Sequence, residues 1–147
     1  TMLEADFTDF EQMIDDVYAA IDITKADLDE CADLLVFRIL DRTRRGEDIY
    51  GVPFDAYAAK TKQSKRKRGR RTSPVTLQDT GRMLASMRGR SDGDVALVYF
   101  ASRTEGQKAA WLDEGTRDMP ERRFMDATPA DLDACADVLL ERIIGRF

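Results

Sequence analysis

The sequence predicts an α+β fold in which N- and C-terminal amphipathic helices pack on a small antiparallel sheet. One segment occurs twice, as TKADLDECADLLVFRI from Thr24 and as TPADLDACADVLLERI from Thr128. Between the copies, two short strands are predicted near 87–90 and 95–100 on either side of the turn sequence SDGD, which is typical of a β-hairpin. A chain of 147 residues, 43% of them hydrophobic, has the size of one domain, so we expect a single unit over 1–147.

Each copy of the repeated segment has the pattern of an amphipathic helix. Apolar residues recur at steps of three and four, and a capping threonine precedes an aspartate by three residues, at Thr24 and Asp27 and again at Thr128 and Asp131. We expect two matched helices that lie side by side and cover the same face of the sheet. Convergence is an open alternative, because capping and an apolar stripe fix many positions by themselves.

Residues 1–23 form an acidic extension in front of the first copy. Apolar residues continue there at helical spacing, and this predicts a helix over 8–21, either separate from the next helix or continuous with it. The apolar positions are Phe10, Met13, Ile14, Val17 and Ile21. Residues 4–33 contain eleven acids and one base, so we expect no secretory leader. No apolar run approaches the roughly 20 residues of a membrane-spanning helix.

The central part of the sequence contains a concentrated basic run. Residues 60–71 hold eight Lys or Arg and no acid, which leaves 15 bases against 28 acids in the rest of the chain. Because the run contains Gly69 and lacks apolar periodicity, we expect residues 60–74 to form a long, exposed and mobile basic loop. Beyond it, the sequence predicts a helical turn near 80–86, the hairpin, and a short helix that ends at Gly115.

The residue types that most catalytic sites require are missing. The chain has no histidine, and its two cysteines, Cys31 and Cys135, have no CxxC partner, so we expect both in the core. Asp113 and Glu114 are adjacent and would point in different directions on a helix, which makes them a poor carboxylate pair. We therefore expect no enzyme: no catalytic residue, no cofactor and no metal site.

Two groups of residues are candidates for contacts with other molecules. The basic run suits phosphate groups or an acidic protein surface, but it has no interleaved aromatics for base stacking, and a solvated loop is its plain alternative. Its candidates are Lys60, Lys62, Lys65, Arg66, Lys67, Arg68, Arg70 and Arg71. Aromatic residues and methionines outside the helices suit subunit contacts, although some must cap the sheet. They are Tyr50, Phe54, Tyr57, Trp111, Met119, Phe124 and Met125.

Three motifs occur in one order before the second copy of the repeat: GVPFDAYAAKTKQSK, TLQDTGRMLASM and KAAWLDEGTRDMPERRFM. Together with the terminal helix they resemble the phage virion-morphogenesis family, the Mu-like and P2-like tail-completion and neck proteins. The resemblance covers residues 45–144, and relatives often carry Tyr-Ala and His-Gln where this chain reads YFAS and WLDE. The matching positions are Gly51, Pro53, Phe54, Tyr57, Leu77, Asp79, Thr80, Gly81, Met83, Ser86, Gly115, Thr116, Pro120, Arg122 and Phe124.

The resemblance implies a structural protein of the bacteriophage virion, assembled from the host cytoplasm into the neck, that completes the tail or joins it to the DNA-filled head. It implies a homo-oligomeric ring, a hexamer before a dodecamer, in contact with neighbouring neck and tail proteins and with the DNA in the channel. The basic run alone supports an alternative, a small accessory protein that binds nucleic acid without sequence specificity. Within the matched positions, we expect Asp79, Thr80 and Gly81 to cap the helix that follows, and Arg122 to clamp a loop carboxylate.

Overall fold

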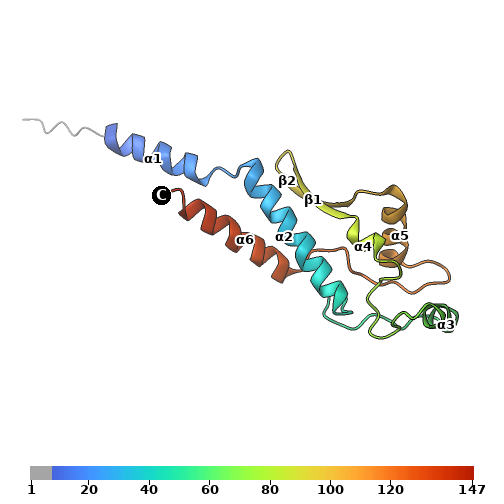
Figure 1. Ribbon diagram of the computed structural model, residues 1–147. Coiled ribbons are helices and arrows are strands. Elements are labelled where there is room, and N and C mark those ends of the chain that lie inside the picture. The colour runs from blue at the N-terminus through green and yellow to red at the C-terminus, as the bar shows by residue number, and fades with distance from the viewer. Residues whose placement is uncertain (1–7) are drawn as a thin grey trace, which may run out of the picture.

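The computed structural model describes residues 8–147 and has an α+β fold, as the sequence predicts (Figure 1). Residues 1–7 of the expected N-terminal extension lie outside the described residues. The elements, in chain order, are α1 Thr8–Ile21, α2 Lys25–Arg44, α3 Ala59–Lys67, α4 Arg82–Ala85, β1 Met87–Asp92, β2 Val95–Phe100, α5 Arg103–Glu114 and α6 Pro129–Ile144.

The two strands form the expected antiparallel hairpin. They pair from Met87 opposite Phe100 to Asp92 opposite Val95, so β1 extends two residues beyond its predicted end. Gly93 has a φ of +59°, a left-handed conformation that a two-residue hairpin turn favours and that glycine adopts without steric cost. The SDGD sequence therefore fixes both the turn and the register of the pair.

The helix α2 lies between the hairpin and α6 (Figure 1). The prediction that the two matched helices lie side by side is confirmed, but the prediction that both cover the sheet is wrong, because α6 packs on the side of α2 that faces away from the strands. Of the two matched helices, only α2 packs on the sheet, and it does so very closely. A Cβ atom on Gly89 of β1 would lie 2.6 Å from the carbonyl carbon of Ala32, so this strand position requires glycine.

The main core lies where α2, the hairpin, α4 and α5 meet. Ile39 of α2, Leu84 of α4, Met87 of β1 and Phe124 of the segment before α6 are almost completely buried there. The segment that carries Phe124 is held by α5, because the Asp113 carboxylate accepts hydrogen bonds from the N–H groups of residues 124 and 125 at 2.8 and 3.0 Å. The core therefore joins the middle of the sequence to the segment in front of α6.

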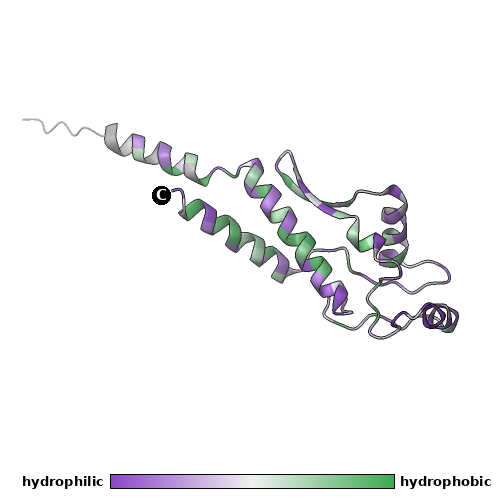
Figure 2. Cartoon of the chain, in the orientation of Figure 1, coloured by the Kyte–Doolittle hydropathy of each residue, from purple (hydrophilic) through white to green (hydrophobic). Residues whose placement is uncertain are grey.

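The predicted basic loop is wrong over residues 60–67, because these residues belong to α3. The physical reason is propensity: the segment AKTKQSKRK has neither glycine nor proline, and Ala, Lys, Gln and Arg are favourable in helices without any apolar stripe. Gly69, with a φ of +67°, follows the helix, and the N–H of Arg70 bonds back to the carbonyl of Lys65 at 2.9 Å. Figure 2 shows α3 as hydrophilic nearly throughout.

The helix α1 is separate from α2, because Thr24 caps α2 after a break at residues 22–24. It extends beyond the α2–α6 pair at the end of the molecule opposite α3 (Figure 1). Met13, Tyr18 and Ile21 are exposed on it, whereas the side chains of Phe10 and Ile14 lie outside the described part. Within residues 8–147, no helix is long and apolar enough to cross a membrane.

Candidate functional site

The two copies of the repeated segment are joined by ion pairs that run in both directions between α2 and α6. In one direction, Asp131 of α6 accepts from Arg38 Nε at 2.7 Å and from Arg42 Nη1 at 2.8 Å, both on α2. The same carboxylate accepts from the N–H of Thr128 at 2.9 Å and completes the predicted capping box. Burial alone would raise the pKa of Asp131, but these hydrogen bonds outweigh burial and lower it to about 2.

In the other direction, Asp27 of α2 accepts from Arg142 Nε at 2.5 Å and from the Arg146 guanidinium. The hydrogen bond from the Thr24 N–H, followed by that from Arg146, lowers the pKa of the Asp27 carboxyl far below its ordinary value. Asp27, Arg38 and Arg42 of α2 each have a counterpart 104 residues later, so the ion pairs are pseudo-symmetric. Capping and an apolar stripe do not require arginines at these positions, but reciprocal pairing does. Reciprocal pairing therefore accounts for the aspartate and the two arginines that recur in both copies.

The two cysteines mark the crossing point of this helix pair. Cys31 Sγ lies 3.9 Å from the carbonyl oxygen of Cys135, and Cys135 Sγ lies 3.8 Å from that of Cys31. Both are free and buried, which confirms their predicted place in the core. Burial raises the pKa of both thiols, so they remain protonated and poorly nucleophilic at neutral pH.

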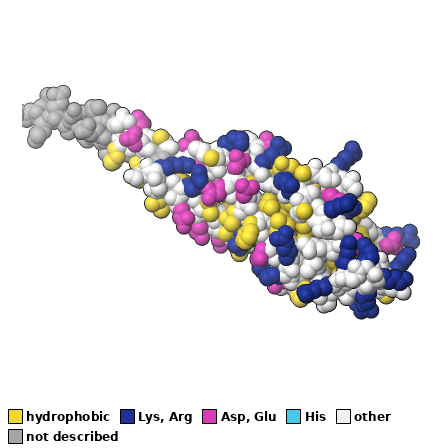
Figure 3. Space-filling view, in the orientation of Figure 1, with side chains coloured by type: hydrophobic (Ala, Val, Ile, Leu, Met, Phe, Trp, Pro, Cys, Tyr) yellow, Lys and Arg dark blue, Asp and Glu magenta, His cyan; other side chains and the backbone are white. Residues whose placement is uncertain are grey.

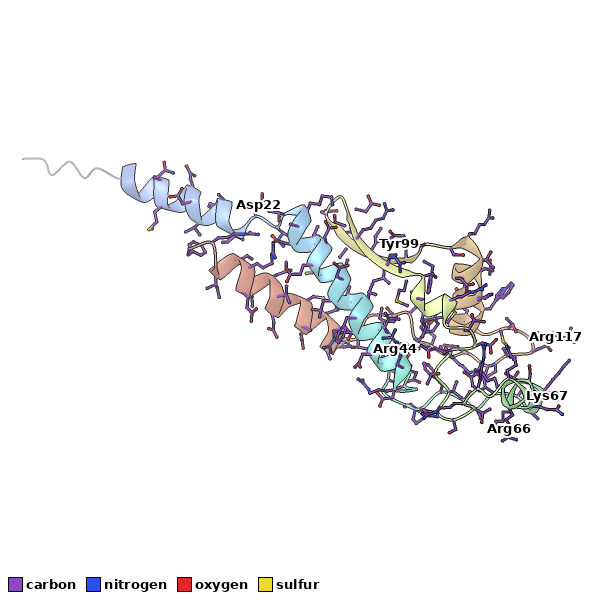
Figure 4. All side chains as sticks on the ribbon, viewed as in Figure 1. Asp22, Arg44, Arg66, Lys67, Tyr99 and Arg117 are labelled. Carbon is purple, nitrogen blue, oxygen red and sulfur yellow. The ribbon has the colours of Figure 1, made fainter. Side chains whose placement is uncertain are left out.

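The eight basic candidates lie on and just after α3, at the end of the molecule opposite α1. Figure 3 shows blue side chains gathered at this end and magenta ones over the end that carries α1 and α6. Arg66 and Lys67 point outward from α3, and Arg117, from the loop after α5, lies at the same end (Figure 4). Sequence reasoning missed Arg117, because a lone arginine 46 residues after Arg71 gives no local signal.

Lys65 is the exception among these residues, since it is buried. Its Nζ donates to the carbonyl oxygen of Gln78 at 2.5 Å and lies 4.8 Å from the centre of the Tyr57 ring. Burial lowers the pKa of Lys65, although the charge of Asp79 opposes the effect. The prediction that Lys65 is exposed on a loop is therefore wrong: this side chain fastens α3 to the loop before α4.

Asp79 holds the basic segment to the body and does not cap α4, contrary to the sequence prediction. Its carboxylate accepts from Arg68 at 2.8 Å and from Arg70 at 2.9 Å, and the Arg68 hydrogen bond is the main cause of its lowered pKa. The only cap contact among the three predicted residues is made by Thr80 Oγ1, which accepts from Arg82 N at 3.4 Å. Gly81 contributes its left-handed backbone, with a φ of +79°.

Five of the eight basic candidates form no ion pair within residues 8–147. These are Lys60, Lys62, Arg66, Lys67 and Arg71, and we call them, with Arg117, the basic face. All are exposed or half-buried, so their charges are available to a partner. Sequence reasoning found five of these six residues, but it could not separate them from those that Asp79 neutralises.

Arg122 clamps a loop, as expected, but through backbone carbonyls and not through a carboxylate. Its Nε donates to the oxygen of Asp55 at 3.3 Å and its Nη2 to that of Ala56 at 3.2 Å. The guanidinium also lies 5.6 Å from the centre of the Tyr57 ring. Arg122 is buried, so its guanidinium serves to hold the fold.

The aromatic candidates divide into buried and exposed residues, and the turn candidates shape one loop. Phe54 and Phe124 are core residues, while Tyr50 and Trp111 remain exposed and can contact a partner. Gly115 ends α5 with a φ of +76°, and the chain then turns back through a bridge between residues 116 and 119 to the exposed Pro120. The matched Gly and Pro positions thus shape the loop that carries Arg117.

A groove crosses the surface between α3 and α5. It consists of two adjoining hollows, of about 420 Å³ and about 360 Å³, which share Leu77, Asp79 and Leu112 in their walls. Tyr57 and Lys60 border the first hollow, and Trp111, Met119 and Lys108 border the second. Sequence reasoning did not find this groove, because it is formed by residues from four separate segments.

No group of three or more potential metal ligands occurs within the described residues. We found no protein family, curated protein or solved structure that matches this chain.

Proposed function

We propose that this chain is a structural component of a phage neck, which completes the tail or joins it to the DNA-filled head as a ring, with a hexamer favoured. The observation that carries the proposal is the division of the molecule into an acidic end with an extended helix and an opposite end with the basic face (Figure 3). A subunit with complementary ends suits head-to-tail assembly, and such contacts generate closed rings when the rotation between subunits closes.

In this ring, the basic face lies against DNA in the channel or against an acidic surface of the adjacent ring. The motifs GVPF, LQDTG and PERRF, on which the family resemblance rests, support this placement. They also have clear structural roles here, since Phe54 and Phe124 fill the core and Arg122 fastens the loop of residues 55–56.

Negative-stain microscopy of lysates tests the proposal. In a phage whose copy of this gene carries a stop codon at Glu4, we expect full heads beside unjoined tails, or overlong tails if the protein is the tail terminator. Normal infectious particles would refute a role in the neck. Reversal of charge at Arg66, Lys67 and Arg71, which belong to the basic face but do not line the groove, tests the channel contact separately, and virions that still retain their DNA and assemble normally would exclude it.

A second function, binding to nucleic acid without sequence specificity, is favoured by the basic face alone. Binding through phosphate contacts would weaken steeply as salt rises, because each contact releases condensed counterions. Gel retardation of duplex DNA across a salt series distinguishes the two functions. Retardation by the wild-type protein at moderate salt, lost in the triple Glu variant of Arg66, Lys67 and Arg71, would favour this second function.

A further inference from the structure

The helix α1 has an apolar face that the described part of the chain leaves exposed. Met13 and Ile21 lie on that face, and they are 50% and 49% exposed. A helix of 14 residues has marginal stability in water unless its apolar face packs against something. The segment 8–24 also contains five acids and no base, so its polar side is uniformly negative. Such a helix suits an apolar groove with a positive border.

The groove between α3 and α5 has these properties. Its walls include the apolar side chains of Leu77 and Leu112, and Trp111 at its border is 51% exposed. The cations that line it are Lys60, Lys65, Arg68 and Lys108, against the two acids Asp79 and Glu105, which gives a net charge of +2. The basic face on α3 adds further positive charge beside it (Figure 4).

The groove and α1 lie at opposite ends of the molecule, so α1 does not fill the groove of its own chain (Figure 1). We propose that α1 of one copy binds in the groove between α3 and α5 of the next copy, as an amphipathic helix in an apolar groove. The contact joins two different surfaces. Two bound copies therefore still have one free α1 and one free groove between them, and further subunits can add there. This inference rests on the ring assembly proposed above and identifies the contact that builds it.

A complementation experiment with two full-length variants tests the contact. The arm variant, Met13→Glu with Ile21→Glu, has a polar α1 and an intact groove. The groove variant, Trp111→Glu, has an intact α1 and a charged groove. We expect the wild-type protein to form oligomers in light scattering after size exclusion, and each variant alone to be monomeric. An equimolar mixture should form a 1:1 dimer and nothing larger, because only one arm and one groove remain functional.

Controls separate this contact from general effects. Val95 is 50% exposed on the hairpin, away from both surfaces, so Val95→Glu should keep wild-type association. Lys60→Glu tests the groove through its charge without a change at Trp111, and it should weaken association. A monomeric wild type, an arm or groove variant that still forms wild-type oligomers, or a mixture that stays monomeric would each overturn the inference.

The two proposals can fail independently. A complementing 1:1 dimer together with normal particles from the nonsense phage would retain this contact and refute the neck function. Failed complementation together with unjoined heads and tails would refute this contact and retain the neck function.

Discussion

Replacement of Asp131 by asparagine tests whether the reciprocal ion pairs hold α6 to α2. Asparagine keeps the size of the side chain and an oxygen for the Thr128 N–H, but it removes the negative charge between Arg38 and Arg42. Arg42 would then be a buried cation without a counter-ion, since its side chain is 8% exposed. Removal of one partner from a buried ion pair costs about 3–5 kcal/mol.

The expected cost lies at the lower end of this range, about 3 kcal/mol. Arg42 keeps two acceptors, because its Nη2 donates to the carbonyl oxygens of Phe124 at 3.3 Å and Asp126 at 2.9 Å. For a domain of this size, a loss of about 3 kcal/mol lowers the melting temperature by roughly 10 °C. Urea unfolding followed by circular dichroism measures the free energy of unfolding directly.

Asp27→Asn provides a matched control at the pseudo-equivalent position. The arginines that pair with Asp27 are more exposed, with Arg142 at 39% and Arg146 at 26%, so water can solvate them when the carboxylate is lost. We therefore expect Asp27→Asn to destabilise the protein less than Asp131→Asn. Equal losses, or a larger loss at Asp27, would show that burial of the arginine does not set the cost and would refute the reasoning.

Four further predictions follow from single contacts. Gly89→Ala should lower the free energy of unfolding by about 2 kcal/mol, because its Cβ would meet the backbone of Ala32, and a chemical denaturation curve measures this. Gly115→Ala should cost about 1–3 kcal/mol, since its φ is +76° and its Cβ would lie 2.8 Å from a backbone nitrogen of the next loop; thermal melting tests it. Arg122→Lys should cost about 1–3 kcal/mol in the same assay, because one ammonium cannot replace the planar fork that bonds two carbonyls. Asp131 has its pKa lowered from 3.8 to about 2, so its contribution to stability is complete above pH 4 and is lost as the pH falls towards 2; acid titration of Asp131→Asn should show a shallower loss over this window.

Local signals predicted much of the fold. The capping threonines at 24 and 128 marked the starts of α2 and α6, and the SDGD turn marked the hairpin, because these features depend on neighbouring residues. The helix α3 was missed because a run of charged residues has no apolar periodicity, even though its propensity is favourable. The prediction that α6 covers the sheet was also wrong. An apolar stripe shows that one face of a helix is buried, but it does not show which element covers that face.

The candidate site depended on contacts between distant residues, and these left a weaker signal. Asp79 and Lys65 both changed role, because ion pairing and burial are decided by segments that the sequence does not show to be close. The sequence does contain one long-range signal. Both aspartates and all four of their arginine partners repeat at an interval of 104 residues, and this regularity could have predicted the reciprocal pairing.

The pseudo-symmetric helix pair has a consequence for the synthesis of the protein. During translation α2 leaves the ribosome about a hundred residues before α6, with Asp27, Arg38 and Arg42 already in place but with their partners not yet made. The nascent helix therefore exposes the thiol of Cys31 and a row of unmatched charges until α6 emerges. Because contacts over so long a separation are slow to form, the side of α2 that later packs on α6 stays open to a chaperone or a second nascent chain until α6 is made.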